Sequence, residues 1–579
     1  MPSSSALVRV TCGYAVIAIA CGEPGHDTAL ASHEGEICVK VLVIGAGPVG
    51  LTMASELARR GVSVRIIDKS HAPSQLSKAL AVHARTLEVF EQMGAVDAFL
   101  TRGFRVSGMT AWLGPGNRTA EVNLANLDSP YPFVLDIPQS VTEEILIHHL
   151  KTFAVEVERQ VELLSLAGKD DGVTAVLRHS DGREEIVHTG WVVGCDGAHS
   201  TVRHQLGVSF EGTPYPDLFA LADVKIHWSL PQDRIQMFLT TDELVAAFPY
   251  GEGRYRLMTS IHPTNGDEKL PLAPTLEWFQ QMVDSRCGVA ATLSDAVWMD
   301  TFHSHLRHAK QTRFGRIFLV GDAAHIHSPA GGQGMNTGIQ DAYNLAWKLA
   351  LVAEGSAVQS LLDSYQVERL AVAESVLRLS DGLLRGATSR SRVVKFLRNH
   401  LAPMLAHMNV VQERMTGQLA ETAIHYRRSP IVAEHFTRAP GAARRVLRAG
   451  DRAPDNMLSG AQIGVKRFYD LLSSTKHHLV MDLSTGVPSA LVEALMSWGH
   501  VLELMGVERE MTVDKSGLSG LNFRVIPDDT ASFAKRYGLV PGSLLLIRPD
   551  GYIGYISDTL DASHLVEYLT QTLGALPTR

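Results

Sequence analysis

The clearest pattern of apolar positions lies near the N-terminus, where runs of strand length alternate with helical spacing. Residues 39–44, Val-Lys-Val-Leu-Val-Ile, form an apolar run of strand length, which is typical of a buried parallel strand. Glycines follow at once, and then come apolar residues at helical spacing from Leu51 to Arg60. A second apolar strand covers residues 62–67 and ends on Asp68. This order predicts one complete βαβ unit.

The middle of the chain predicts a second sheet between two pieces of this pattern. Alternating residues from 155 to 193 predict antiparallel strands, and residues 191–196 are typical of a buried strand that enters a turn. Residues 211–306 are rich in Val, Phe, Tyr and Thr, as in an antiparallel sheet. A third glycine-bearing strand at 316–321 precedes a long helix predicted from about Met335 to Glu354. The first domain is therefore predicted to be discontinuous, with a sheet domain inserted in it.

The end of the chain predicts a separate small domain. Residues 361–447 have a mostly helical pattern, and a turn-rich junction follows at 449–455. Beyond it, strands are predicted at 479–483, 523–526, 544–548 and 552–556, and helices at 489–498 and 564–573. This mixed order indicates a small α/β domain.

The composition excludes several classes of protein. Of the 579 residues, 45% are hydrophobic, which excludes a disordered chain and a small disulfide scaffold. Lys and Arg number 53 against 61 Asp and Glu, a net charge of −8, so nothing favours a nucleic-acid or anionic-membrane partner. Five scattered cysteines do not suit a secreted fold or a zinc cluster. We expect a cytoplasmic protein without a membrane span, which binds a small molecule.

Residues 1–36 precede the first patterned strand. Residues 14–20, Tyr-Ala-Val-Ile-Ala-Ile-Ala, resemble the core of a short signal peptide, but Arg9 is the only charged residue before them. We therefore favour a disordered leader or an extended start site over export.

Three glycines follow the first strand at the spacing GxGxxG. Gly45, Gly47 and Gly50 suit a tight turn, close approach of a pyrophosphate to the backbone, and close packing of helix on strand. Asp68 lies 18 residues after Gly50, where a carboxylate accepts hydrogen bonds from ribose hydroxyls. The context favours a dinucleotide site, and a glycine turn without a ligand is the alternative.

A second glycine-rich segment follows the third strand. Gly321 and Asp322 end that strand, and residues 329–334, Pro-Ala-Gly-Gly-Gln-Gly, precede the helix that contains Asn336. The acidic residue suits a second sugar-like chain of a dinucleotide and the glycines suit a flat ring, whereas the alternative is a surface loop. His325 and His327 have no acidic or cysteine partner at ligand spacing, so we predict no metal site.

Three motifs together resemble those of the single-component FAD-dependent aromatic hydroxylases. They are the glycine motif with Asp68, the segment Gly194-Cys-Asp-Gly-Ala-His-Ser-Thr-Val-Arg203, and Gly321-Asp-Ala-Ala-His325 continued through Gly334-Met-Asn336. The resemblance extends to the branch that acts on phenols and polyketides, which carries a C-terminal thioredoxin-like domain. It implies an α/β fold with a Rossmann-like FAD domain like that of p-hydroxybenzoate hydroxylase, an inserted antiparallel substrate sheet and that C-terminal domain.

The resemblance also implies roles for individual residues. Asp68 would bind the adenosine ribose, Asp322 the ribityl and pyrophosphate part, and residues 329–336 would lie along the isoalloxazine ring. Arg85 could instead cap a helix, and Asp196 could only brace the fold. The complete predicted FAD set is Gly45, Gly47, Pro48, Gly50, Asp68, Arg85, Gln139, Asp196, Arg203, Gly321, Asp322, Pro329, Gly332, Gly334, Met335 and Asn336.

The function implied by the resemblance is oxygen insertion into an aromatic ring. NADPH or NADH reduces FAD, O₂ forms a C4a-hydroperoxyflavin, and this species hydroxylates a phenolic or polycyclic, polyketide-like substrate. Only one GxGxxG follows a strand, which fits a transiently bound nicotinamide cofactor. The alternatives are an epoxidase, a Baeyer–Villiger or an antibiotic-modifying enzyme of the same superfamily, and a non-catalytic flavin-binding interaction protein.

The sequence leaves the catalytic base open. The family often places an acidic residue shortly before the arginine matched by Arg85, but residues 79–84 contain no carboxylate. The polar candidates are His83, Tyr250, Tyr255 and Arg256, each of which could equally be structural.

The C-terminal domain has no cysteine at the thioredoxin position, residues 482–488, so it is expected to act in packing or in a homodimer. The expected segments are a leader at 1–36, the FAD domain at 37–210 and 307–448 (with the helical region), the substrate sheet at 211–306, and the thioredoxin-like domain without CxxC at 449–579.

Overall fold

The structure is a computed structural model. It describes residues 39–575 except 75–78, 115–117, 240–243, 262–273, 327–330, 390, 392, 398, 401–407, 438–446, 459–465, 473–474 and 509–522. The predictions made for residues 1–36, His327 and Pro329 lie outside the described residues.

An eight-stranded sheet carries the predicted βαβ unit. Its main order is β17-β18-β11-β1-β2-β8, and β10 and β9 extend it beside β11. The central strand β1 (Val39–Ile44) pairs in parallel with β2 (Val64–Asp68) and with β11 (Glu184–Gly194), and its apolar side chains are buried, as the pattern predicted. The other strands are β8 (Val157–Arg159), β9 (Glu162–Gly168), β10 (Val173–Arg178), β17 (Arg313–Phe314) and β18 (Ile317–Leu319).

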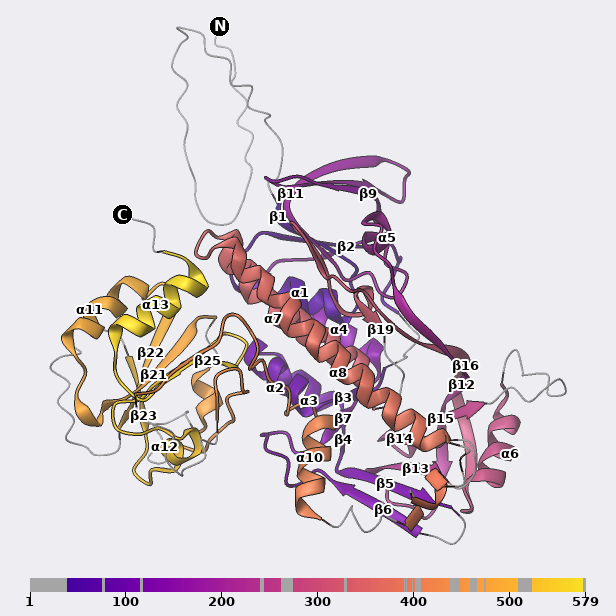
Figure 1. Ribbon diagram of the computed structural model, residues 1–579. Coiled ribbons are helices and arrows are strands. Elements are labelled where there is room, and N and C mark those ends of the chain that lie inside the picture. The colour runs from indigo at the N-terminus through magenta and orange to yellow at the C-terminus, as the bar shows by residue number, and fades with distance from the viewer. Residues whose placement is uncertain are drawn as a thin grey trace, which may run out of the picture. The chain divides into compact units, whose positions relative to one another are not determined.

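Two helices follow strands of this sheet and pack closely on each other (Figure 1). α1 (Pro48–Arg59) follows β1, and α7 (Gln333–Ala353) follows β18 after a 3-10 turn at Gly321–Ala323. A Cβ atom at Gly338 would lie 2.8 Å from Val49 Cγ2, so glycine permits this close crossing. The remaining helices of this part are α2 (Ala84–Met93), α3 (Val96–Arg102), α4 (Gln139–Lys151), α5 (Thr201–Gln205) and α8 (Asp363–Thr388).

A second, mostly antiparallel sheet lies between the two halves of the first domain in sequence. Its order is β19-β16-β12-β15-β14-β13-β5-β6, so two strands that precede residue 211 also join it. α6 (Leu276–Arg286) buries Phe279, Met282 and Val283 against one face of the sheet. The strands are β5 (Gly108–Leu113), β6 (Arg118–Asn123), β12 (Glu211–His227), β13 (Arg234–Leu239), β14 (Val245–Gly251), β15 (Arg254–Ile261), β16 (Thr292–His308) and β19 (His325–Ile326). We call it the substrate sheet.

A small three-stranded sheet packs against the other face of the substrate sheet. Its order is β3-β7-β4, with β3 at Ala81–Val82, β7 at Val134–Asp136 and β4 at Phe104–Val106. Ala81, Val106 and Val134 are buried in one cluster with the partly buried Ile235 of β13. Leu135 and Val82 of the small sheet lie in the core of the first domain, so the small sheet connects that domain to the substrate sheet.

The C-terminal part forms a six-stranded mixed sheet in the order β20-β25-β24-β21-β22-β23. Apolar side chains of α11 and α13 fill one core and those of α12 fill another. The elements are β20 (Ala433–His435), β21 (His477–Asp482), α11 (Ser489–Trp498), β22 (Leu502–Glu508), β23 (Phe523–Pro527), α12 (Ser532–Tyr537), β24 (Leu544–Ile547), β25 (Ile553–Ser557) and α13 (Ala562–Leu573). The preceding helix α10 (Asn409–Leu419) contacts β6 of the substrate sheet instead (Figure 1). The pattern located α11 at both ends but missed β22 and α12.

Four fully buried charges join α7 and α8 to the turn between β24 and β25. Glu368 accepts hydrogen bonds from Lys348 Nζ at 2.7 Å and from Arg548 Nη1 at 2.6 Å, and Arg548 also pairs with Asp550. Two positive and two negative groups balance, which lets them remain buried. We call these residues the buried charge network.

The region predicted to be mostly helical is only partly so. α8 and α10 account for its described helices of eight residues or more, and described residues 420–437 form turns, loops and β20. Within the described residues, no helix has the length and apolar character needed to cross a membrane.

Candidate functional site: an FAD cradle beside an apolar sheet face

The glycine motif forms a tight turn between β1 and α1. Gly45 has φ +100°, and a Cβ atom there would lie 2.5 Å from Cys195 O. A Cβ at Gly50 would lie 1.9 Å from Gly45 O, so only glycine lets the helix begin here. Gly47 is different, because a Cβ there would have no described neighbour within 4 Å. The first and third glycines thus serve packing, and the second borders open space at the start of the helix.

Asp68 lies at the end of β2 beside a pocket of about 1180 Å³. Its carboxylate oxygens accept hydrogen bonds from the backbone N–H groups of Ala46 at 2.7 Å and Ser70 at 2.8 Å, which fix its orientation. Arg159 of β8 lies 3.7 Å from the same carboxylate. The pocket is lined by Ala46, Gly47, residues 68–74, Glu143, residues 159 and 160, Glu162, residues 178–180 and Gly182.

The second glycine-rich segment forms the turn before α7. Gly331 and Gly332 have φ angles of +91° and +63°, which favour glycine, and Gly332 caps the helix. Asn336 donates hydrogen bonds to Ala81 O and to Gly332 O, both at 2.8 Å, and accepts one from His83 N at 2.9 Å. Asn336 therefore holds this turn against β3. Among the other predicted residues here, Asp322 is exposed, and Gly334 would meet nothing within 4 Å if it carried a Cβ.

Asp196 and Arg203 lie where the second motif meets the third. Asp196 Oδ2 accepts a hydrogen bond from Val202 N at 3.1 Å, while its buried Oδ1 has no hydrogen-bond partner. Arg203 donates to Ala323 O at 3.1 Å and to Ala198 O at 2.8 Å. Arg203 thus joins the two motifs, whereas the hydrogen bond of Asp196 stays within its own motif.

An apolar face of the substrate sheet carries one buried ion pair. Arg256 of β15 pairs through two hydrogen bonds of 2.8 Å with Asp223 of β12, and its Nη1 donates to Ala79 O at 3.3 Å. The neighbouring positions on this face include the partly buried Phe248, Trp298 and Phe302. The face thus offers aromatic side chains around one oriented guanidinium.

The other candidate bases have distinct surroundings. His83 is 4% exposed, its Nε2 lies 2.9 Å from Gly331 O, and burial lowers its pKa to about 4, so the ring is neutral at pH 7. Tyr255 packs in the core under α6 and accepts a hydrogen bond from Trp228, on the face opposite Arg256. Tyr250 is half-buried, and burial raises its pKa. His83 and Tyr250 lie on the side of Arg256, but Tyr255 does not.

Comparison with known proteins identifies the family. The profile of the "FAD binding domain" family matches residues 38–380. The chain belongs to this family. A 6-methylpretetramide 4-monooxygenase of Streptomyces rimosus is 34% identical over 534 residues, which cover 89% of this chain and 90% of the relative. A pentachlorophenol 4-monooxygenase of Sphingobium chlorophenolicum is 32% identical over 523 residues, with 89% and 93% covered.

A solved structure agrees with these relatives over nearly the whole chain. The anhydrotetracycline hydroxylase OxyS of Streptomyces rimosus superimposes with a TM-score of 0.71 at 28% identity, covering 93% of this chain and 99% of the hydroxylase. The predicted resemblance, the FAD cofactor and the enzyme class are therefore confirmed: this family member is an FAD-dependent aromatic monooxygenase. Its α/β fold with an FAD-binding domain is confirmed as well.

The residues present fit FAD in this monooxygenase. The pocket beside Asp68 has room for a nucleoside, and the start of α1 presents backbone N–H groups and the positive end of a helix dipole. A Cβ at Gly47 would extend into that space. When bound, FAD carries the hydride and activates oxygen, and the protein supplies orientation and water exclusion.

Gln139 lies next to the pocket beside Asp68, whereas Arg85 contacts another part of the molecule. Gln139 begins α4 and donates to Glu143 Oε1 at 2.9 Å, and Glu143 lines the pocket. Arg85 instead donates to Asp550 O at 2.7 Å and to Glu88 at 2.8 Å, and its guanidinium lies 5.0 Å from the centre of the Tyr552 ring. The structure thus places Arg85 against the C-terminal part, away from the pocket beside Asp68.

Sequence reasoning missed a buried carboxyl group at the end of β7. Asp136 is 1% exposed, and neither of its carboxylate oxygens has a hydrogen-bond partner. The available signal was one acidic residue in the otherwise apolar segment 132–138, Pro-Phe-Val-Leu-Asp-Ile-Pro. The candidates named from the sequence, His83, Tyr250, Tyr255 and Arg256, do not include this carboxyl.

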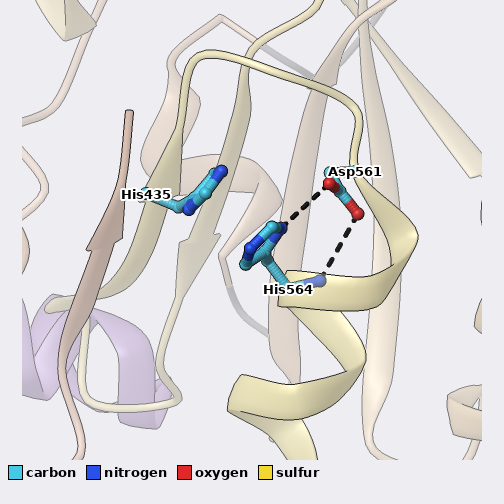
Figure 2. Close-up of side chains that lie close together, drawn as sticks. All are labelled: His435, Asp561 and His564. Carbon is cyan, nitrogen blue, oxygen red and sulfur yellow. Dashed lines mark hydrogen bonds and ion pairs between the residues drawn. The ribbon is translucent and has the colours of Figure 1, made fainter. Parts of the chain in front are cut away.

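Two histidines and an aspartate meet in the C-terminal part (Figure 2). The rings of His435 and His564 stack with centroids 3.6 Å apart and planes 21° apart, and His564 Nδ1 lies 2.9 Å from Asp561 Oδ2. The lone pairs of ring nitrogens lie in the ring planes, so those of two nearly parallel rings do not converge on one ion. The stack therefore serves to pack β20 against α13.

Proposed function

We propose that this FAD-dependent monooxygenase hydroxylates a polycyclic phenol of the polyketide type. The observation that carries the proposal is the apolar face of the substrate sheet, where partly buried aromatic side chains surround Arg256. Flat aromatic rings pack on such a face, and the ion pair of Arg256 with Asp223 gives it one polar point. Relatives named for 6-methylpretetramide and anhydrotetracycline are consistent with a polycyclic substrate, and the relative named for pentachlorophenol with a phenol.

The test is a panel of simple and polycyclic phenols incubated with the purified protein and either NADPH or NADH. We expect one polycyclic phenol to stimulate consumption of the reductant and to gain one oxygen atom by mass spectrometry. Consumption without a hydroxylated product from any phenol would contradict the proposal. An epoxide or a lactone as the product would instead indicate one of the alternative oxygenations.

We also propose that the predicted residue set binds FAD as the resemblance implies. Asp68 holds the adenosine ribose, Asp322 the ribityl chain, and the turn before α7 lies along the flavin ring. The support for this assignment is the pocket beside Asp68 and the position of Asn336 between that turn and β3. Arg203 and Asp196 are proposed to serve a transient NADPH or NADH site as well.

For the C-terminal part we propose a thioredoxin-like domain, residues 449–579, that acts in packing or in a homodimer. Its mixed sheet with helices on both faces supports this proposal, and the sequence contains no cysteine after Cys287 for dithiol exchange. We further propose the limits 37–210 and 307–448 for the FAD domain, 211–306 for the substrate domain, and a cytoplasmic location. Gel filtration of the full chain and of a chain that ends at Arg448 tests the dimer. Only the full chain should elute at the volume of a dimer.

A further inference from the structure

The unpartnered Asp136 lies where the small sheet faces the substrate sheet. Residues i and i+2 of a strand share a face, so the side chain of Asp136 lies on the same face as Val134. Val134 packs in one cluster with Ile235 of β13. Ile235 in turn shares a face with Met237, which packs on the apolar face that carries Phe248 and Trp298. Asp136 therefore faces the proposed substrate face.

Arg256 of β15 acts on Asp136 electrostatically from the substrate sheet. Its attraction lowers the pKa of Asp136, but burial has the larger effect and raises that pKa to about 8. Asp223 occupies the Nε–Nη2 edge of the guanidinium through two hydrogen bonds, and Nη1 donates to Ala79 O. Asp136 is thus a second carboxyl beside one guanidinium, without a bond to it.

The other elements around Asp136 bring few charged groups. β3 consists of Ala81 and Val82 and has no titratable side chain. β4 contributes Arg105, which is exposed, and β14 contributes the half-buried Tyr250. Proteins pair nearly all buried polar groups, so two orphaned oxygens at a domain junction indicate a ligand that completes them.

We propose that Asp136 binds the hydroxyl group of the phenolic substrate and accepts its proton. The proposal rests on the proposed function and names the base that the sequence left open. The O–H bond of the phenol breaks, the proton moves to a carboxylate oxygen of Asp136, and the electron pair stays on the phenolate oxygen. The phenolate ring is richer in electrons and is attacked more readily by an electrophilic oxygen. The proton returns to that oxygen after hydroxylation, so Asp136 is unchanged over one cycle.

β3 places this base beside the turn proposed to hold the flavin. Ala81 of β3 pairs with Asp136 across the small sheet, and the carbonyl of Ala81 accepts the hydrogen bond from Asn336. A Cβ at Gly332 would lie 3.2 Å from Ala81 Cβ. The proposed flavin turn and Asp136 thus both border β3, which brings the proposed flavin site and the proposed base into one region of the molecule.

The test compares Asp136→Asn with the wild type, using the phenol identified by the panel. Asparagine keeps the size and a hydrogen bond but cannot accept a proton. We expect kcat/KM at pH 8 to fall by at least about 100-fold, since general bases contribute about 10²- to 10⁴-fold. In the wild type kcat/KM should rise with pH up to about pH 8 and level off, whereas in the variant it should continue to rise as the phenol itself ionises near pH 10. Asp97→Asn, on the exposed face of α3, is the matched control and should behave as the wild type.

A second substrate separates a base from a structural residue. A polychlorinated phenol is ionised at neutral pH and needs no base, so Asp136→Asn should hydroxylate it within about threefold of the wild type. An equal loss with both phenols, or an unchanged pH profile, would overturn the proposal. If Asp136→Asn does not retain FAD, Asp136→Glu is the second variant, because it keeps the proton acceptor. Its kcat/KM should still level off near pH 8, and a kcat/KM that keeps rising would also overturn the proposal.

A binding measurement distinguishes failure of this proposal from failure of the proposed function. If the wild type hydroxylates no phenol, the proposed function fails. Naphthol and its methyl ether can then be titrated into the holoenzyme at pH 9 and followed by the flavin absorbance. The wild type should bind the phenol at least about 10-fold more tightly than the ether, as expected for a charge-assisted hydrogen bond, and Asp136→Asn should lose most of that preference. Equal affinities in the wild type, or no spectral change with either ligand, would overturn the role of Asp136.

Discussion

Replacement of Glu368 by glutamine tests whether the buried charge network holds the C-terminal part on the rest of the molecule. Glu368 is fully buried, and five hydrogen bonds end on its carboxylate, from Lys348, from both terminal nitrogens of Arg548, and from Ser429 and Asn344. Its pKa is held far below the usual range because the attraction of Arg548 and Lys348 outweighs burial. Glu368→Gln leaves a buried network with one uncompensated positive charge.

The expected loss follows from that imbalance. Removal of one partner from a buried ion pair costs about 3–5 kcal/mol, because the remaining charge stays buried without its counter-ion. The matched control is Glu354→Gln, whose carboxylate is 39% exposed and pairs with Lys40 at 2.8 Å. An exposed pair contributes about 0–1 kcal/mol. We therefore expect a difference of at least about 2 kcal/mol between the two variants.

The assay is urea unfolding followed by far-UV circular dichroism at pH 7, with limited proteolysis as a second measurement. Glu368→Gln should unfold at a lower urea concentration and be cleaved between α8 and the C-terminal sheet sooner than the wild type. Equal midpoints for Glu368→Gln and Glu354→Gln would refute the reasoning, because the network would then contribute no more than an exposed pair.

Three further substitutions test the FAD cradle and its surroundings. Gly50→Ala should yield a colourless or poorly folded protein, since its Cβ would lie 1.9 Å from Gly45 O, and a preparation with a full flavin spectrum would contradict this. Asp322→Ala should weaken FAD binding about 10- to 100-fold in an equilibrium titration, as expected for loss of a charge-assisted hydrogen bond of about 1.5–3 kcal/mol, and unchanged affinity would remove the assignment. As pH falls from about 6.5 to about 4, the His83→Gln protein should lose less stability than the wild type. In the wild type only the unfolded state takes up a proton on His83 in this range, because burial lowers the pKa of the folded histidine to about 4. The free energies of unfolding should diverge by up to about 3 kcal/mol. Parallel pH curves for the wild type and His83→Gln would contradict it.

The parts of the fold that repeat a local pattern could be predicted from the sequence. β1 and α1 are marked by an apolar run, three glycines and helical spacing, all within about twenty residues, and each is a local constraint. The strand of Arg256 could be placed in a sheet for the same reason. The pairing of β5 and β6 with that sheet could not, because a parallel partner is chosen by tertiary packing and leaves no periodic signal.

The candidate site was predictable where chemistry requires a residue type at a fixed spacing. Asp68 and Asn336 fall into this group, and the structure places each beside a glycine turn. Arg85 illustrates the limit, since its direction depends on a contact with Asp550, which lies 465 residues away in sequence. Asp136 illustrates it as well, because its significance arises from the absence of a partner, which only the packed structure reveals.

The most direct test of the central claim is the fate of molecular oxygen labelled with ¹⁸O. The purified holoenzyme, NADPH or NADH and the best phenol of the panel are incubated under ¹⁸O₂, and the product is analysed by mass spectrometry. An aromatic monooxygenase places one labelled atom in each product molecule and releases the other as water. Recovery of the consumed oxygen as hydrogen peroxide with no label in any phenol, or label that comes from water instead of O₂, would contradict the account.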